Sequence, residues 1–211
     1  MRMFPTIATV VALAGSAPST QTVLRPEFLE ARGVSQWDIE GNGQWRMSGN
    51  VLQLHSAGVP AGPIRKPAAM AIFKSEPFGD FTLDVDLRST APVDLDVRDV
   101  LLIFGYQSPT RFYYVHLSRK TDAVHNGIFL VNDADRKRLD PPTSVSRLVD
   151  QEWHHVRLVR EVASGRIQVS FDADPNPVLS VVDGTLTSGR VGVGSFDETA
   201  EFKGLALSPK P

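Results

Sequence analysis

The chain has 211 residues, 22 lysines and arginines against 24 aspartates and glutamates, and a formal net charge of −2. This length fits a single domain that buries a core without metal or disulfide crosslinks. The absence of cysteine excludes thiol catalysis, zinc–thiolate sites and disulfides. No long Lys/Arg run or basic stripe is present, which argues against nucleic acid or an anionic membrane surface as a partner.

Residues 1–17 have the pattern of a short signal peptide, with a positive charge at Arg2, an apolar run over 7–13 and small residues after it. The alternative is a first β-strand of the domain. No segment reaches the roughly 18 apolar residues that a membrane-spanning helix needs. We therefore expect an exported protein, periplasmic or extracellular and bacterial, with a polar lead-in over 18–35 and a folded domain over 36–211.

Apolar and polar residues alternate with a period of two along much of the rest of the chain. The clearest example is "DFTLDVDLR" at 80–88, where four apolar side chains face one way and the polar ones face the other. Gly, Pro, Asp and Asn separate the segments, and no window keeps a helical period. These features predict an all-β fold, an antiparallel two-sheet sandwich. The further strands are expected at 50–55, 69–74, 99–106, 111–118, 124–131, 153–161, 166–172, 177–182, 189–195 and 200–207.

Three of these strands, 99–106, 111–117 and 124–131, are apolar on both faces. Such strands lie in the middle of a sheet, and their second face needs a cover. In a sandwich this cover is a loop, the N-terminal segment, or a ligand that lies in a concave groove.

Several stretches resemble the concanavalin A-like lectin/glucanase superfamily over about residues 36–207. They are "FGDFTLDVDLRS", "FYYVHLSRKTDAVHNGIFLV", "EWHHVRLVREVASGRIQVSFD" and "SGRVGVGSFDETAEFKGLAL". Within it the chain looks closest to laminin-G-like domains and to the bacterial domain family linked with 3-keto-disaccharide hydrolases. The resemblance implies a jelly-roll sandwich, and it leaves activity open because this fold carries lectins, hydrolases, lyases and structural modules.

The chain departs from the glucanases of this superfamily at their catalytic strand. Their Glu-x-Asp-x-(x)-Glu run is absent, and the nearest approximations are Asp84-x-Asp86 and Asp94-x-Asp96. Asp84 and Asp86 are expected on a solvated sheet face. A conventional glucanase that works through two paired carboxylates is therefore excluded.

The strand over 111–118 carries the candidate ligand-binding face. Its pleat places Val115 and Leu117 on the core side, and Phe112, Tyr114 and His116 on the other side. An aromatic ring beside hydrogen-bonding groups suits a sugar, whose C–H face stacks while its hydroxyls bond. These residues either face a ligand on the concave sheet or lie half-buried beneath a loop.

His125 and Asn126 open the next predicted strand and point to opposite faces, so only one of them shares the face of His116. If it is His125, two imidazoles form a possible proton-transfer pair.

Three functions stay open: a secreted carbohydrate-binding domain, a structural laminin-G-like domain, and an enzyme. In the enzyme, a hydrolase or lyase that acts by elimination, His116 or His125 takes a C–H proton and Tyr114 protonates the leaving oxygen.

Arg65 and Lys66, in a Gly/Pro-rich loop, and Arg111 are candidate rim cations for an acidic or carbonyl-bearing saccharide, although a plain surface loop explains them equally well. No cofactor is required by any motif. The resemblance implies that a structural calcium is possible, with Asp197 and Glu201 as candidate ligands. The sequence does not predict an oligomeric state.

Overall fold

A computed structural model describes residues 33–142 and 145–209. A single turn of 3-10 helix, η1 (Gly33–Gln36), precedes the strands. The predicted signal peptide and most of the lead-in lie outside the described residues. Within the described ranges no helix is long and apolar enough to cross a membrane.

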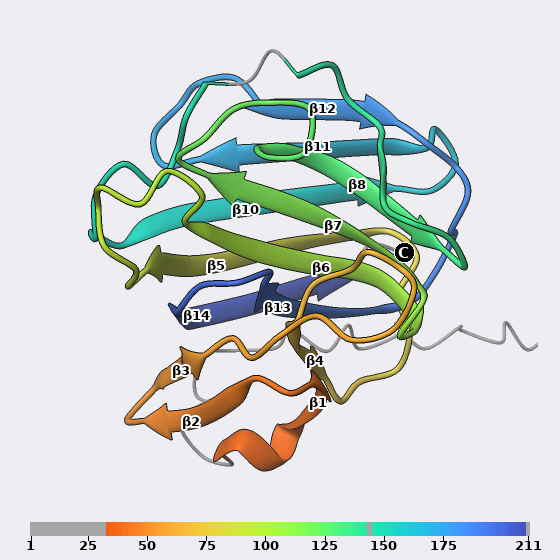
Figure 1. Ribbon diagram of the computed structural model, residues 1–211. Coiled ribbons are helices and arrows are strands. Elements are labelled where there is room, and N and C mark those ends of the chain that lie inside the picture. The colour runs from red at the N-terminus through yellow and green to blue at the C-terminus, as the bar shows by residue number, and fades with distance from the viewer. Residues whose placement is uncertain (1–32, 143–144, 210–211) are drawn as a thin grey trace, which may run out of the picture.

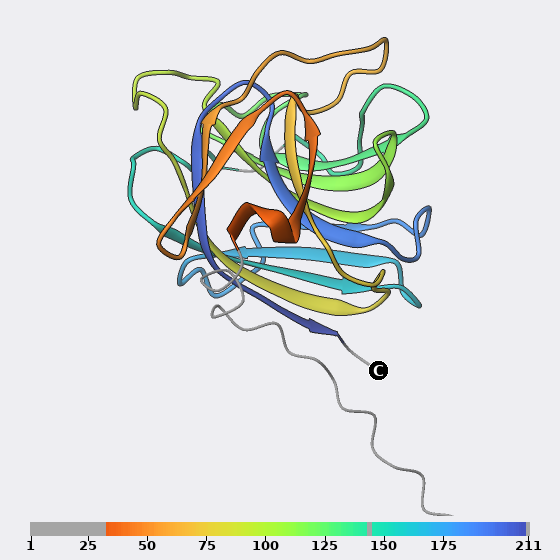
Figure 2. The ribbon, with the colours of Figure 1, turned by 90° about the horizontal axis from the view of Figure 1, so that it is seen from below.

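The strands form two antiparallel sheets of seven strands each, stacked face to face (Figures 1 and 2). This confirms the predicted all-β sandwich. In spatial order, sheet A consists of β1 (Trp37–Gly41), β4 (Ala69–Phe73), β13 (Arg190–Ser195), β6 (Asp99–Ser108), β7 (Arg111–Ser118), β8 (Gly127–Asn132) and β9 (Lys137–Arg138). Sheet B consists of β12 (Leu179–Val182), β11 (Arg166–Phe171), β10 (His154–Glu161), β5 (Phe81–Ser89), β14 (Ala200–Pro209), β3 (Val51–Ser56) and β2 (Gln44–Ser48).

The main core lies between the sheets and follows from the alternation in the sequence. Along β5 every second residue is buried, beginning with Phe81, and the residues between them are half-exposed. Leu83 of sheet B and Leu102 and Val115 of sheet A belong to this core and are fully buried. The alternation with a period of two thus determines which face of each strand is buried in the core.

A second apolar cluster covers the opposite face of sheet A, which we call the outer face. Strands β4, β6, β7 and β8 contribute to it, and Ile64, from the segment between β3 and β4, packs against it. Figure 1 shows that segment running across sheet A. The cluster consists of Met70, Ile72, Leu101, Ile103, Tyr106, Phe112, Tyr114, Phe129, Val131 and Phe196. Strands with two apolar faces therefore lie mid-sheet, as predicted, and protein side chains supply their cover.

All predicted strands correspond to observed ones, with two kinds of difference. Strand β8 begins at Gly127 rather than at 124, because Asn126 has a positive φ of 54° and the chain turns there. Strands β1, β2 and β9 were not predicted. Strand β2 has no fully buried residue and β9 has two residues, so neither gives a strong apolar pattern.

The core is tested by truncating Leu102, which is fully buried between the sheets. Leu102→Ala should lower the free energy of unfolding by about 2 to 5 kcal/mol, since it removes apolar contacts and leaves a cavity. Val182→Ala is the control, because Val182 is 72% exposed, and should change stability by less than about 0.5 kcal/mol. Chemical denaturation measures both, and equal effects would contradict this assignment of the core.

Candidate functional site

The register of β7 and β8 brings two histidines together on the outer face of sheet A. His116 pairs with Gly127, the first residue of β8, and the turn at Asn126 brings the ring of His125 next to His116. The ring centroids of His116 and His125 are 5.3 Å apart. His125, and not Asn126, therefore shares the face of His116, which the sequence left open.

Asp122 fixes the orientation and tautomer of His125. Its Oδ1 lies 2.8 Å from Nδ1 of His125 and also accepts the backbone N–H groups of Val124 and His125. Burial opposes ionisation of this carboxyl, but these hydrogen bonds outweigh it and lower the pKa of Asp122 to about 2. Because an ionised carboxylate only accepts, Nδ1 carries the proton and Nε2 keeps its lone pair.

His125 is therefore a neutral imidazole with an accessible acceptor atom. Burial lowers its pKa, the hydrogen bond to Asp122 partly opposes this, and the nearby charges of His116 and Arg136 lower it further. Its side chain is 16% exposed. Nε2 has no hydrogen-bond partner within the part of the chain that the structure describes, so it can accept a proton or a hydrogen bond from a ligand.

His116 is held at both ring nitrogens. Nδ1 lies 3.1 Å from the carbonyl oxygen of Val124, and Nε2 lies 3.1 Å from Oδ2 of Asp99. The other oxygen of Asp99 accepts the hydroxyl of Ser195, and the backbone N–H of Phe196 contacts the same carboxylate. Both nitrogens of His116 are therefore occupied, and of these two histidines it is His125 that keeps a ring nitrogen without a partner among the described residues.

Tyr114 lies on the predicted face but is completely buried. Its ring stacks on Phe129 at a centroid distance of 5.0 Å and contacts Phe196 at 5.7 Å. Burial raises the pKa of Tyr114, and the charge of Arg136 opposes this. Among the described residues the hydroxyl has no hydrogen-bond partner of good geometry, although a weaker interaction with Arg136 also lowers its pKa. Of the two alternatives for Tyr114 and His116, the structure shows them buried, with Phe196 in contact with both rings.

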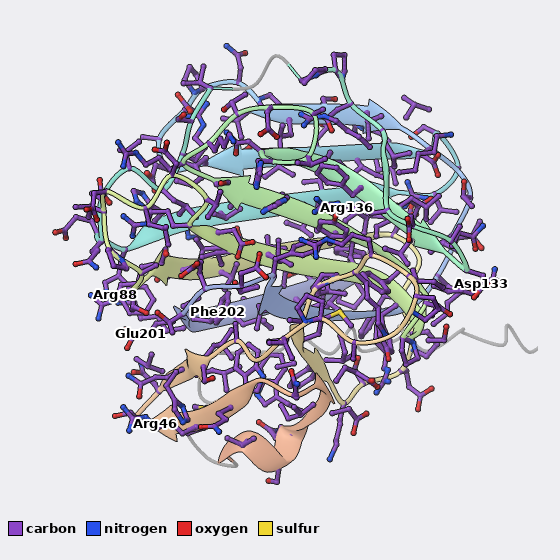
Figure 3. All side chains as sticks on the ribbon, in the orientation of Figure 1. Arg46, Arg88, Asp133, Arg136, Glu201 and Phe202 are labelled. Atoms are coloured by element: carbon purple, nitrogen blue, oxygen red, sulfur yellow. The ribbon has the colours of Figure 1, made fainter. Side chains whose placement is uncertain are left out.

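Arg136 is the functional candidate that the sequence analysis missed. Its guanidinium lies 4.5 Å from the ring centroid of Phe196 and 5.7 Å from that of Phe129. Figure 3 shows it in front of the strands of sheet A. The "NDADRKRLD" turn after β8 was the available signal, since a hairpin at that point returns the chain over the outer face.

The three predicted rim cations lie at different places. Arg65 is next to Arg136: its guanidinium is 5.4 Å from the ring centroid of Phe196, and its carbonyl oxygen accepts the backbone N–H of Arg136. Nζ of Lys66 instead donates to the carbonyl of Pro109 at 3.2 Å. Arg111 forms an exposed ion pair with Asp133 at 3.7 Å. Of the three, Arg65 lies near the two histidines, because it contacts Phe196, whose ring stacks on His116.

Asn126, predicted to bind a ligand, holds the turn that carries His125. It is buried; its side-chain oxygen accepts the backbone N–H of Ser118, and its side-chain nitrogen donates to the carbonyl of Val145. Arg138 clamps the same turn by donating to the carbonyls of residues 122, 125 and 126. Gly127 makes room for this clamp, because a Cβ there would lie 2.6 Å from Cζ of Arg138.

Asp197 and Glu201, the candidate calcium ligands, do not lie with other carboxylates in a group that could hold a metal ion in the described residues. Oε2 of Glu201 is 2.6 Å from Nη2 of Arg88, and Oε1 accepts a hydrogen bond from Gln53 on the solvent side of sheet B. Figure 3 shows Arg88 and Glu201 side by side. Asp197 is exposed. In residues 33–142 and 145–209 no group of three His, Asp or Glu side chains is placed to hold a metal ion.

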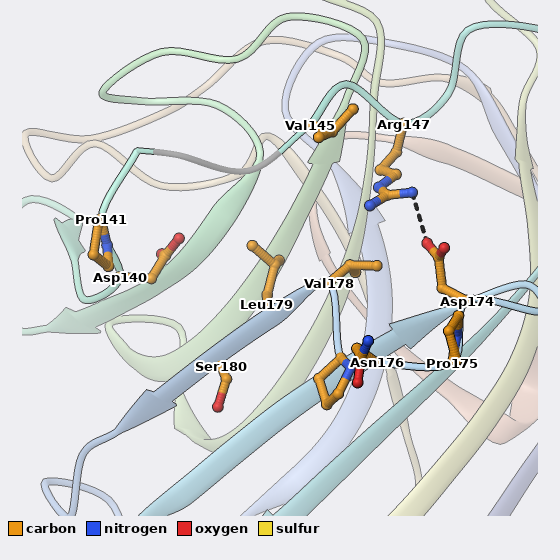
Figure 4. Close-up of a pocket in the computed structure, with 11 residues that line it drawn as sticks. Asp140, Pro141, Val145, Arg147, Asp174, Pro175, Asn176, Val178, Leu179 and Ser180 are labelled. Carbon is orange, nitrogen blue, oxygen red and sulfur yellow. Dashed lines mark hydrogen bonds and ion pairs between the residues drawn. The ribbon is translucent and has the colours of Figure 1, made fainter.

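Two other regions contain charged side chains but are weaker candidates for the site. The charges described there are already paired with each other. Asp84 and Asp86 both contact His155 on the solvent side of sheet B, as expected for a solvated face. A pocket of about 340 Å³ lies beside β12 (Figure 4). Its charged side chains include Arg147 and Asp174, which pair with each other at 2.9 Å. The outer face of sheet A is therefore the better candidate site.

Comparison with known proteins establishes the fold. No family model matches the chain, and no curated protein matches its sequence. The carbohydrate binding module CBM66 from Bacillus subtilis matches at a TM-score of 0.65 and 17% identity, over 82% of this chain and 95% of that one. The winged bean acidic lectin, complexed with methyl-alpha-D-galactose, matches at 0.59 and 14%, over 89% and 98%.

A mutant of the GH43 protein BlXynB from Bacillus licheniformis matches at a TM-score of 0.56 and 10% identity, over 83% of this chain and 37% of that one. At these identities the likeness concerns the fold alone. The chain has the concanavalin A-like jelly-roll fold that the sequence resemblance predicted.

The Asp122–His125 pair predicts a specific dependence of stability on pH. The pKa of Asp122 is lowered from 3.8 to about 2. Its contribution to folding is therefore fully present above about pH 4 and is lost as the pH falls toward 2, and we expect about 1 to 2 kcal/mol. Urea unfolding of wild type and Asp122→Asn at pH 6 and pH 3 should show a difference that shrinks at the lower pH. A constant difference would contradict the assignment.

Proposed function

We propose that this protein is a carbohydrate-binding domain that contacts its saccharide on the outer face of sheet A. The contacts are made by Nε2 of His125 and by the guanidinium groups of Arg65 and Arg136. Tyr114, His116 and Phe196 form the buried bed beneath them. The N-terminal pattern over 1–17 supports the further proposal that the protein is exported.

The single observation that carries this proposal is the state of His125. It is the histidine in the cluster that combines an oriented tautomer, a neutral ring and an accessible nitrogen, which follow from its bond to Asp122 and its position. A saccharide hydroxyl needs such an acceptor. The shared fold with a carbohydrate binding module and a lectin supports the ligand class.

The Asp122–His125 pair also favours a second candidate function, glycoside cleavage by elimination. Nε2 of His125 would take the proton from a carbon next to a carbonyl or carboxylate, the C–H electrons would form a C=C bond, and the glycosidic oxygen would leave. Water would have to protonate that oxygen, because Tyr114 is buried with a raised pKa. An enzyme that works in this way would be a hydrolase or lyase of the 3-keto-disaccharide type.

A glycan screen that reads both retention and product release tests these proposals. Wild type should be retained by at least one saccharide, and His125→Ala should weaken the affinity by about tenfold or more, since it removes a hydrogen bond and the oriented ring. His155→Ala is the matched control, because His155 lies on the solvent side of sheet B, and should leave the affinity within about twofold of wild type.

Thermal melting checks that both variants fold. Retention without products defines a binding domain, whereas products that disappear in His125→Ala define the enzyme. An equal loss of affinity in both variants would contradict the site. No retention of any saccharide would leave the structural, laminin-G-like alternative.

A further inference from the structure

Arg65 and Arg136 differ from most surface arginines of this protein in having no carboxylate partner. Arg111, Arg147 and Arg157, for example, pair with Asp133, Asp174 and Asp84. In the described ranges neither Arg65 nor Arg136 forms an ion pair, although the two are tied together through their backbones. An adjacent pair of guanidinium groups without counter-charge is a ready place for an anion.

Both guanidinium groups are held by contacts that leave most of their hydrogen-bond donors available. Arg136 also interacts with the hydroxyl of buried Tyr114, which uses part of its donor set. They lie over the ring of Phe196, at 5.4 Å for Arg65 and 4.5 Å for Arg136. A guanidinium that rests on an aromatic face keeps its N–H groups directed outward, in a planar fork that matches a carboxylate. The aromatic bed thus orients the arginines without neutralising them.

The acidic residues near the pair bond to groups other than the two guanidinium groups. Oδ1 of Asp135 accepts the backbone N–H of Arg65 at 2.7 Å. Asp133 pairs with Arg111 and accepts the hydroxyl of Thr110. Asp122 holds His125. The carboxylate that would complete the two arginines has to come from the ligand.

We propose that the saccharide bound at this site is acidic, a uronic acid whose carboxylate is bound by Arg65 and Arg136 and whose ring hydroxyl donates to Nε2 of His125. This rests on the proposed function and specifies its ligand. The two guanidinium groups can bind a planar carboxylate, and Nε2 of His125 beside them can accept a hydrogen bond from a hydroxyl, which together match a uronic acid. A neutral sugar has no carboxylate to pair with either guanidinium.

Isothermal titration calorimetry of the full chain tests this with oligogalacturonate, oligomannuronate and oligoguluronate, each compared with its methyl-esterified form. The acidic form of at least one should bind about tenfold or more tightly than its ester, and higher salt should weaken it. Arg65→Gln and Arg136→Gln should each reduce the affinity for the acid by about tenfold to a hundredfold and should weaken binding of the ester by a clearly smaller factor.

Arg157→Gln, on the solvent side of sheet B, should change neither affinity and is the matched control. Arg136→Lys keeps the charge but loses the fork, so it should bind the acid more weakly than wild type and more tightly than Arg136→Gln. Equal binding of acid and ester, or binding of neutral or sulfated saccharides alone, would overturn this inference and leave the proposed function intact. Failure to bind any saccharide would overturn both.

Discussion

The outer face of sheet A must be covered, and the rest of the structure depends on how that is done. Strands β6, β7 and β8 carry apolar residues on both faces, so the sandwich core satisfies only half of them. Phe196 and Ile64 cover part of the second face. The guanidinium groups of Arg65 and Arg136 lie over the ring of Phe196. Covering an apolar sheet thereby places the cation of Arg136 close to His125, with Arg65 on the same Phe196 ring.

The candidate site depends on two layers of support beneath His125. His116, fixed by Asp99 and by the carbonyl of Val124, packs against the His125 ring. Arg138 holds the backbone of the turn from below by contacts to three carbonyls. A ring fixed in this way loses little freedom when it binds a ligand, which favours affinity and, in the elimination alternative, a defined direction for proton transfer.

The sequence predicted the sandwich because the period of two, as in β5, is a local property that burial enforces. It also placed Tyr114 and His116 on the correct face of β7. It did not predict that they are buried, since the covering segment between β3 and β4 meets the 133–136 turn through contacts such as Arg65 to Asp135, 70 positions apart. Arg136 was missed for the same reason, and the choice between His125 and Asn126 required the register of β7 and β8.

The five histidines of the chain allow the central claim to be measured directly, because they report on both sheets. We would label the histidine ring nitrogens with ¹⁵N and titrate a bound saccharide by NMR. We expect the Nε2 resonance of His125 to shift as a new hydrogen bond forms, while His154 and His155 of sheet B do not respond. Shifts at His154 or His155 with His125 unchanged would contradict it.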